Sequence, residues 1–366
     1  MGERVFYSRL GELWVTDGRS TGTMSLGVDL DFEASAALEG DRLLFRSRGE
    51  LWISDGTPAG TRSVGAGVYP ESFTSLGDRV YFKAEATSGD GELWVSDGTA
   101  AGTRVAVDIL PGDRGSHPTP TAAVGRLWLS ASTPDQGREP WVSDGTPGGT
   151  VPLGDLDSET TGGSRPRFLF PYGRRVLFDL PVEPDPSRNH LWLSDGTEAG
   201  TGPLQDPPGL RLDAHGGLTQ VGESLYFWNF SPEVGHELFV LDRDREEPAV
   251  LDLVPGPGSS APGAMANVDG RLFFSSERAQ GTELWRLDEG GAPVVLATLY
   301  NPGASAVTSP AAPESAAAKN FFEFQPVQIV PWGERMAIFA AEIGPGQPIL
   351  TTTEEWLWIS DGTAAG

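Results

Sequence analysis

The sequence predicts an all-β protein built from the four-stranded blades of a β-propeller, and three observations support this. A short aromatic and β-branched run followed by an Asp-Gly-Thr turn recurs along the whole chain, as in ELWVSDGTAAGT at 92–103. Successive copies lie roughly 40–50 residues apart, a period typical of propeller repeats. The 48 Gly and 30 Pro leave little room for long helices.

Each copy of the repeat is predicted to form a hairpin. Leu93, Trp94 and Val95 have the composition of a strand. Asp97 and Gly98 end it, and a second β run follows at 103–107. We interpret the repeated aspartates as turn residues, because each turn offers one carboxylate whereas calcium loops need several oxygens. They are Asp17, Asp55, Asp97, Asp144, Asp195 and Asp361.

Two further β runs lie between successive hairpins, which gives four strands per unit. One is the apolar run at 80–82, and the other is a shorter run ending at Leu76-Gly77. The aromatic residue of each hairpin is expected to pack between neighbouring blades, where its large apolar area is buried. These anchors are Trp14, Trp52, Trp94, Trp141, Trp192, Phe239, Trp285 and Trp358.

Counting these runs predicts eight blades, with seven as the alternative, in one propeller domain over 1–366. The first unit opens on its second strand at 5–7 and lacks an inner strand, and the last stops after its third strand at 357–359. Unpaired strand edges invite pairing with another chain, so end-to-end self-association is expected. The Pro-rich segment 301–320 is predicted to be a flexible surface insertion.

Composition excludes several functional classes. The net charge of −25 repels phosphate backbones and argues against nucleic-acid binding. No apolar run is long enough for a membrane span, and the absence of Cys excludes disulfides and thiolate chemistry. We expect no cofactor, with a loosely bound calcium left open and metal ligands unassigned.

Six residues outside the repeat register are the candidate binding residues. A tryptophan that does not serve the repeated packing position is free to present a stacking face. Two of the four histidines lie close in sequence and could meet at one face. The candidates are Trp128, Trp228, Trp332, Trp356, His215 and His236. No catalytic constellation is recognisable, because acidic residues are abundant and no pair stands out.

The segment Glu92 to Thr103 resembles the ELWxxDGT repeat family of bacterial proteins, which are often secreted or attached to the cell surface. The resemblance covers nearly the whole chain and implies a β-propeller and an extracellular or cell-surface location. It supplies no catalytic residues.

From these observations we expect a non-enzymatic binding or adhesion propeller that engages a polysaccharide or a protein surface. One alternative is a polysaccharide-active hydrolase or lyase with acidic residues at the central channel. The other is a structural module of a longer repeat array.

Overall fold

The computed structural model describes residues 4–31, 35–65, 68–85, 89–112, 114–158, 162–182, 185–210, 215–243, 245–278, 281–288, 291–300, 323–332, 335–343 and 355–360. In these ranges the chain is all β, with two short 3-10 turns, Ser20–Gly22 and Pro147–Gly149, and no α-helix. No described helix is long and apolar enough to cross a membrane. The predicted insertion at 301–320 lies outside the described residues.

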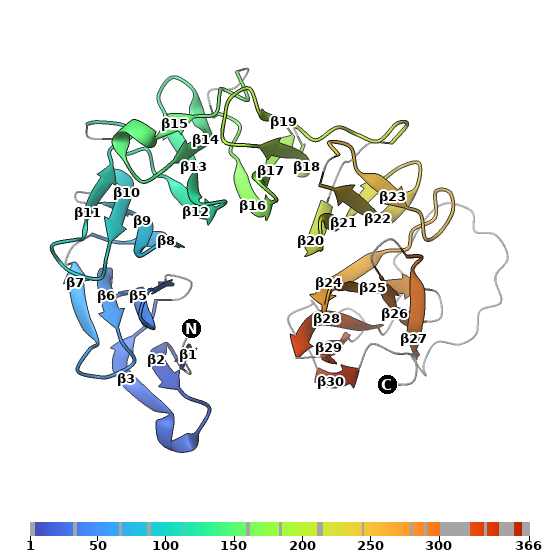
Figure 1. Ribbon diagram of the computed structural model, residues 1–366, viewed down its shortest axis with the longest axis horizontal. Helices are drawn as coiled ribbons and strands as arrows, with labels where there is room; N and C mark the ends of the chain where they lie inside the picture. The colour runs from blue at the N-terminus through green and yellow to red at the C-terminus, as the bar shows by residue number, and fades with distance from the viewer. Residues whose placement is uncertain are drawn as a thin grey trace. The chain divides into compact units, whose positions relative to one another are not determined.

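The strands form eight antiparallel sheets, numbered here in chain order, and neighbouring strands in each sheet are consecutive in sequence (Figure 1). Sheet 1 has three strands: β1 (Val5–Arg9), β2 (Glu12–Thr16) and β3 (Met24–Asp29). Sheet 2 has four: β4 (Ser35–Leu38), β5 (Arg42–Ser47), β6 (Glu50–Ser54) and β7 (Arg62–Gly65). Sheet 3 contains β8 (Glu71–Leu76), β9 (Arg79–Glu85), β10 (Gly91–Ser96) and β11 (Arg104–Val107).

Sheets 4 to 7 repeat the four-stranded plan. Sheet 4 contains β12 (Thr119–Ala123), β13 (Arg126–Thr133), β14 (Gly137–Ser143) and β15 (Val151–Pro152). Sheet 5 contains β16 (Arg167–Tyr172), β17 (Arg175–Val182), β18 (Asp185–Ser194) and β19 (Thr201–Pro203). Sheet 6 contains β20 (His215–Val221), β21 (Ser224–Ser231), β22 (Gly235–Asp242) and β23 (Ala249–Leu251). Sheet 7 contains β24 (Pro262–Val268), β25 (Arg271–Arg278), β26 (Gly281–Leu287) and β27 (Val294–Tyr300).

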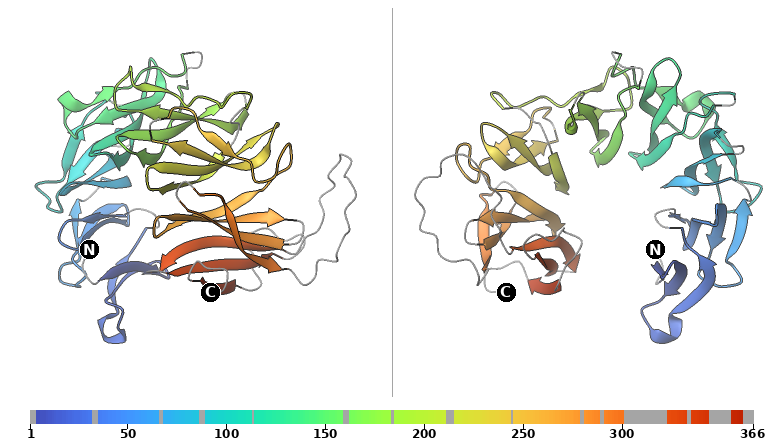
Figure 2. Two further views of the ribbon diagram at one scale, coloured as in Figure 1. Left: turned by 45° about the vertical axis from the view of Figure 1, so that its right-hand side comes forward. Right: turned by 180° about the vertical axis from the view of Figure 1, so that it is seen from behind.

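Sheet 8 contains β28 (Glu323–Trp332), β29 (Arg335–Ile343) and β30 (Glu355–Ser360). The chain divides into two compact units. Unit 1 holds sheets 1 to 5, apart from the short segment Ser187–His190 of β18, and unit 2 holds sheets 6 to 8. Within unit 2, β24 contacts β28, and Figure 2 shows sheets 7 and 8 lying side by side.

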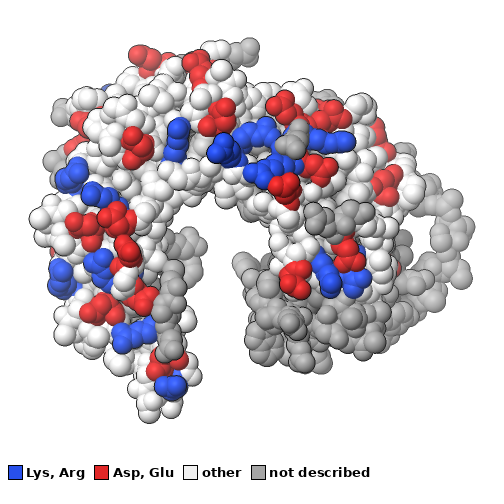
Figure 3. Space-filling model, in the orientation of Figure 1, with Lys and Arg blue, Asp and Glu red and all other residues white. Residues whose placement is uncertain are grey.

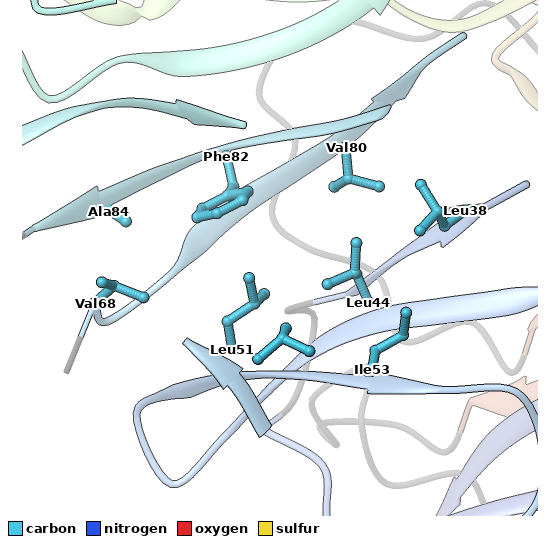
Figure 4. Packing of buried hydrophobic residues seen from close by; sticks show 9 residues of the cluster. Leu38, Leu44, Leu51, Ile53, Val68, Val80, Phe82 and Ala84 are labelled. Carbon is cyan, nitrogen blue, oxygen red and sulfur yellow. The ribbon is translucent and has the colours of Figure 1, made fainter. Parts of the chain in front are cut away.

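Within each unit the core lies between successive sheets, so both faces of an interior sheet are apolar. Leu44 of β5 and Ile53 of β6 face sheet 3, where they pack with Val80 and Phe82 of β9 (Figure 4). The next residue of β5, Phe45, faces sheet 1 instead. Successive strand residues point to opposite faces. This explains why the second strand of each unit is continuously apolar rather than alternating.

The all-β, four-stranded architecture expected from the sequence is confirmed, and it is consistent with a β-propeller. Six sheets have four strands, each in simple up-and-down order. Among the described residues the first strand of sheet 1 pairs only with β2, so sheet 1 has no inner strand. The aromatic position that recurs in the repeat contributes to the packing between sheets, as Trp52 does beside Phe45 and Trp94 does against the cluster of sheets 2 and 3.

Candidate functional site

The repeated Asp-Gly-Thr turn is a closed hydrogen-bond network. One carboxylate oxygen of Asp97 accepts from the backbone N–H of Thr99 at 2.9 Å and from its hydroxyl at 2.7 Å. The hydroxyl of Thr99 in turn accepts from the N–H of Gly102 at 3.0 Å. A Cβ on Gly102 would lie 2.1 Å from that carboxylate, so the position requires glycine. Side-chain and backbone hydrogen bonds from Thr99 lower the pKa of Asp97.

The same network recurs at Asp55, Asp144 and Asp195. Each aspartate therefore serves its own turn. Within the described ranges no three His, Cys, Asp or Glu side chains gather as a metal-binding group. Asp361 lies outside the described residues.

The glutamate that opens the repeat makes a second, longer-range network, which we call the carboxylate latch. Glu92 is 3% exposed. Its carboxylate accepts from the N–H groups of Ile109 at 2.9 Å and Ser116 at 2.7 Å, and from the Ser116 hydroxyl at 2.7 Å. A fourth, longer bond comes from the N–H of Leu110. The latch thus ties sheet 3 to the connection that leads into sheet 4.

Two other sheets repeat the latch. Glu139 accepts from the N–H and hydroxyl of Ser164, and Glu237 accepts from those of Ser260. Burial raises the pKa of Glu92, Glu139 and Glu237, and the bonds from the serines and backbone oppose that rise. The three carboxylates satisfy buried backbone donors, which is a structural task.

The latch was missed in the sequence because its two ends are 23–25 residues apart. A signal was nevertheless present. Each latch serine is followed by one residue and a proline, and that middle residue has positive φ: 46° at His117, 53° at Arg165 and 44° at Ala261. A left-handed residue before proline is uncommon, so a repeated Ser-x-Pro with this geometry marks a fixed connection.

The candidate binding residues occupy different environments. Trp128 is only 1% exposed and donates its indole N–H to the carbonyl of Ala123 at 3.0 Å. It packs with Val142 and Val176 between sheets 4 and 5, so the expectation of an exposed stacking face at Trp128 does not hold. Trp128 has the same register position on β13 as Tyr81 has on β9. This position lies in the interior in every complete sheet of unit 1.

Trp228 and His236 do come together. Their rings lie 5.8 Å apart on neighbouring strands of sheet 6, and the half-buried His236 ring also contacts Phe230 at 5.0 Å. Burial lowers the pKa of His236. The side chains of His215, Trp332 and Trp356 lie outside the described set, so this aromatic group has two of the six predicted members.

One concavity of the described residues lies where sheet 1 lacks its inner strand. It has a volume of about 740 Å³ and is lined by Arg4, Val5 and Phe6 on one side and by residues 37–43 of the β4–β5 hairpin on the other. We call it the β1 groove. In sheets 2 and 3 the corresponding place beside the second strand is occupied by β4 and β8.

Matched positions show what the β1 groove leaves open. The register places Tyr7 of β1 at the position held by Phe45, Phe82, Leu129 and Phe227 in complete sheets. Those four residues are 0% exposed, whereas Tyr7 is only partly buried and Val5 is 59% exposed. The apolar sequence of a second strand is therefore retained in β1, but it is only partly covered.

The described histidine and serine side chains form no catalytic pair. His117 approaches a carboxylate, Glu85, at 4.0 Å, and among the described groups no histidine ring hydrogen-bonds a serine hydroxyl. Acidic and basic side chains of unit 1 are interspersed on the face shown in Figure 3. The negative net charge is thus not concentrated into one field on that face.

Comparisons with known proteins give structural likeness only. No protein-family model and no curated protein matches the chain. Among similar solved structures are a prolyl endopeptidase (TM-score 0.44, 15% identity, 84% of this chain and 44% of that one) and the acylaminoacyl peptidase of Pyrococcus horikoshii (0.40, 14%, 90% and 53%). A puromycin-hydrolyzing peptidase of Mycobacterium tuberculosis is also similar (0.43, 13%, 93% and 56%).

The chain therefore spans about half the length of the structures it resembles. At this identity the likeness concerns the fold. The functional expectation is contradicted here: the similar solved structures are named as peptidases rather than as adhesion or polysaccharide-binding modules. The expected non-enzymatic adhesion propeller is wrong on this comparison and is not carried forward.

Proposed function

We propose that this chain is the polypeptide-receiving propeller domain of a peptidase-type enzyme. The observation that carries the proposal is the β1 groove, in which β1, paired on one edge only among the described strands, borders an apolar concavity. A free edge recognises any extended polypeptide through main-chain hydrogen bonds, and neighbouring pockets then select side chains. No described residue is assigned a catalytic role, because the described polar repeats serve turns and latches.

The test compares three probes on the full chain. Unfolded casein is expected to bind saturably, a natively folded globular protein is not, and a soluble polysaccharide is not. Fluorogenic peptides are expected to remain uncleaved by the chain alone. Binding of the polysaccharide without casein binding would refute a polypeptide role. Cleavage of these peptides by the chain alone, abolished by a serine-directed phosphonate, would show that the chain carries the chemistry itself and would refute a role limited to receiving the polypeptide.

We further propose that the eight sheets are successive blades of one propeller and that the chain belongs to the ELWxxDGT repeat proteins, with an extracellular or cell-surface location. The recurring turn and latch in sheets of equal plan support the first proposal. An electron-microscopy reconstruction would test the blade count. Fractionation of the producing cell would test the location, and recovery of the protein only from the interior would contradict it.

A further inference from the structure

The β1 groove has an internal template, because the complete sheets show what fills the same place. We propose that it binds an extended peptide with the chemistry of β8, the inner strand of sheet 3: an acidic or polar first residue, small polar residues in the middle and a large apolar last residue. The peptide pairs antiparallel with β1. This inference rests on the proposed polypeptide role and names the class of segment the groove selects.

The last residue of the peptide is set by the position that Arg4 occupies. Arg4, the residue before β1, has the same register position as Arg42, the first residue of β5, and Arg79, the first residue of β9. In those sheets the facing residue of the inner strand is an apolar side chain, Leu38 opposite Arg42 and Leu76 opposite Arg79. In sheets 4, 5 and 7 the matching inner-strand residues are also apolar and buried: Ala123, Tyr172 and Val268.

The apolar wall of the groove continues an existing interface. Phe6 and Leu43 both pack against the cluster between sheets 1 and 2, which includes Leu13 and Val15. Both residues also line the groove, together with Leu38. A leucine at the end of the incoming strand would extend that cluster, so the groove has an apolar surface already organised for it.

The middle of the peptide is set by contacts between inner strands of neighbouring sheets. The hydroxyl of Thr74 on β8 accepts from the N–H of Ala122 on β12 at 2.9 Å, and the hydroxyl of Ser75 donates to the carbonyl of Ala37 on β4. β8 thus meets the inner strands on both sides of it, β4 and β12, through short polar groups. Ala37 on β4 has the same register position in sheet 2 as Ala122 has on β12 in sheet 4, and Ala37 lines the β1 groove.

The first residue of the peptide is set by a cross-strand ion pair. Glu71 opens β8 opposite Lys83 and lies 2.6 Å from its ammonium group. In sheet 5 the same register position carries the reversed pair, Arg167 opposite Asp179. On β1 this position is Ser8, an exposed residue without charge. The charge at position 8 should therefore select the charge of the first peptide residue.

The test uses the full chain and two labelled peptides, ESFTSL (the sequence of β8) and RSFTSL. ESFTSL is expected to bind saturably in fluorescence anisotropy, and ESFPSL, with its backbone donor removed, is not. Ser8→Lys should increase the affinity for ESFTSL about two- to fivefold and decrease the affinity for RSFTSL by a similar factor. Ser8→Glu should have the opposite effect on both affinities. Ser158→Lys, the same change in an exposed loop, should alter neither affinity.

The outcomes separate this inference from the proposed function. If casein binds but ESFTSL does not, the groove specificity is wrong and the polypeptide role stands. If neither binds, both fail. Equal affinity of both peptides for every Ser8 variant would place their binding elsewhere and overturn the inference. It would also be overturned if sedimentation showed a second copy of the chain pairing through β1 in place of the peptide.

Discussion

The carboxylate latch gives the prediction with the largest effect on stability. Glu92→Ala removes the acceptor of the Ile109 and Ser116 N–H groups, which lie 2.9 and 2.7 Å from the carboxylate. Leaving a buried donor without a partner costs roughly 1–3 kcal/mol. Two well-placed donors, the weaker bond from Leu110 and the Ser116 hydroxyl together give an expected loss of about 3–5 kcal/mol in the free energy of unfolding.

Urea denaturation followed by tryptophan fluorescence measures this loss. With a slope of about 1–3 kcal/mol per molar urea, the midpoint should fall by at least about 1 M. The matched control is Glu50→Ala, because Glu50 holds the same repeat position but accepts only from the exposed Ser63 hydroxyl at 3.0 Å. That variant should lose less than about 1 kcal/mol. Equal midpoints for the two variants would refute the latch.

The latch also predicts a pH dependence. Burial raises the pKa of Glu92 above the ordinary value of 4.5. The folded chain then takes up this proton more readily than the unfolded chain does. The part of the stability that is linked to this proton is therefore fully present below pH 4.5 and is lost as pH rises through the folded pKa, whereas the hydrogen bonds that the carboxylate accepts are kept. The difference in the free energy of unfolding between the wild type and Glu92→Ala should become smaller as pH rises over that window. Glu92→Gln should remove the part of the pH dependence that comes from this residue. A gap that widens with rising pH would contradict this sign.

Three further predictions follow from the turn, the buried tryptophan and the aromatic pair. Gly102→Ala forces a Cβ to within 2.1 Å of Asp97 and should cost about 1–3 kcal/mol, whereas Gly148→Ala meets no atom within 4 Å and should be nearly neutral in the same urea assay. Trp128→Ala should cost about 3–5 kcal/mol, and a change below 1 kcal/mol would show that this residue is not core. His236 should titrate in NMR below its ordinary pKa of 6.5, so its contribution to stability is present above 6.5 and is lost as pH falls through the folded value.

The parts of the fold that depend on local pattern were predictable from sequence. The hairpin around Trp94 and the turn at Asp97 depend on neighbouring residues, and the missing inner strand beside β1 followed from counting β runs. Contacts between residues far apart in the sequence were not predictable in the same way. Glu92 and Ser116 belong to different units of the repeat, so the repeat pattern alone did not pair them.

Trp128 shows a different limit. It lies outside the register of the aromatic anchors, and this suggested an exposed side chain. It occupies instead the second-strand position that faces the next sheet, where any large apolar side chain is buried. Aligning the second strands as well as the hairpins would have placed it in the core. The β1 groove needed coordinates, because its far wall comes from the β4–β5 hairpin of another unit.

Hydrogen–deuterium exchange of β1 tests the central claim most directly. In an antiparallel strand alternate residues direct their N–H groups to opposite edges. The amides of Val5–Arg9 that face the free edge should therefore exchange quickly in the free chain and become protected at saturating ESFTSL. The amides of β11, the outer strand of sheet 3, should not change. Protection confined to β1 and the 37–43 hairpin is the predicted result. Unchanged exchange of β1 at saturation would contradict strand pairing as the basis of polypeptide recognition.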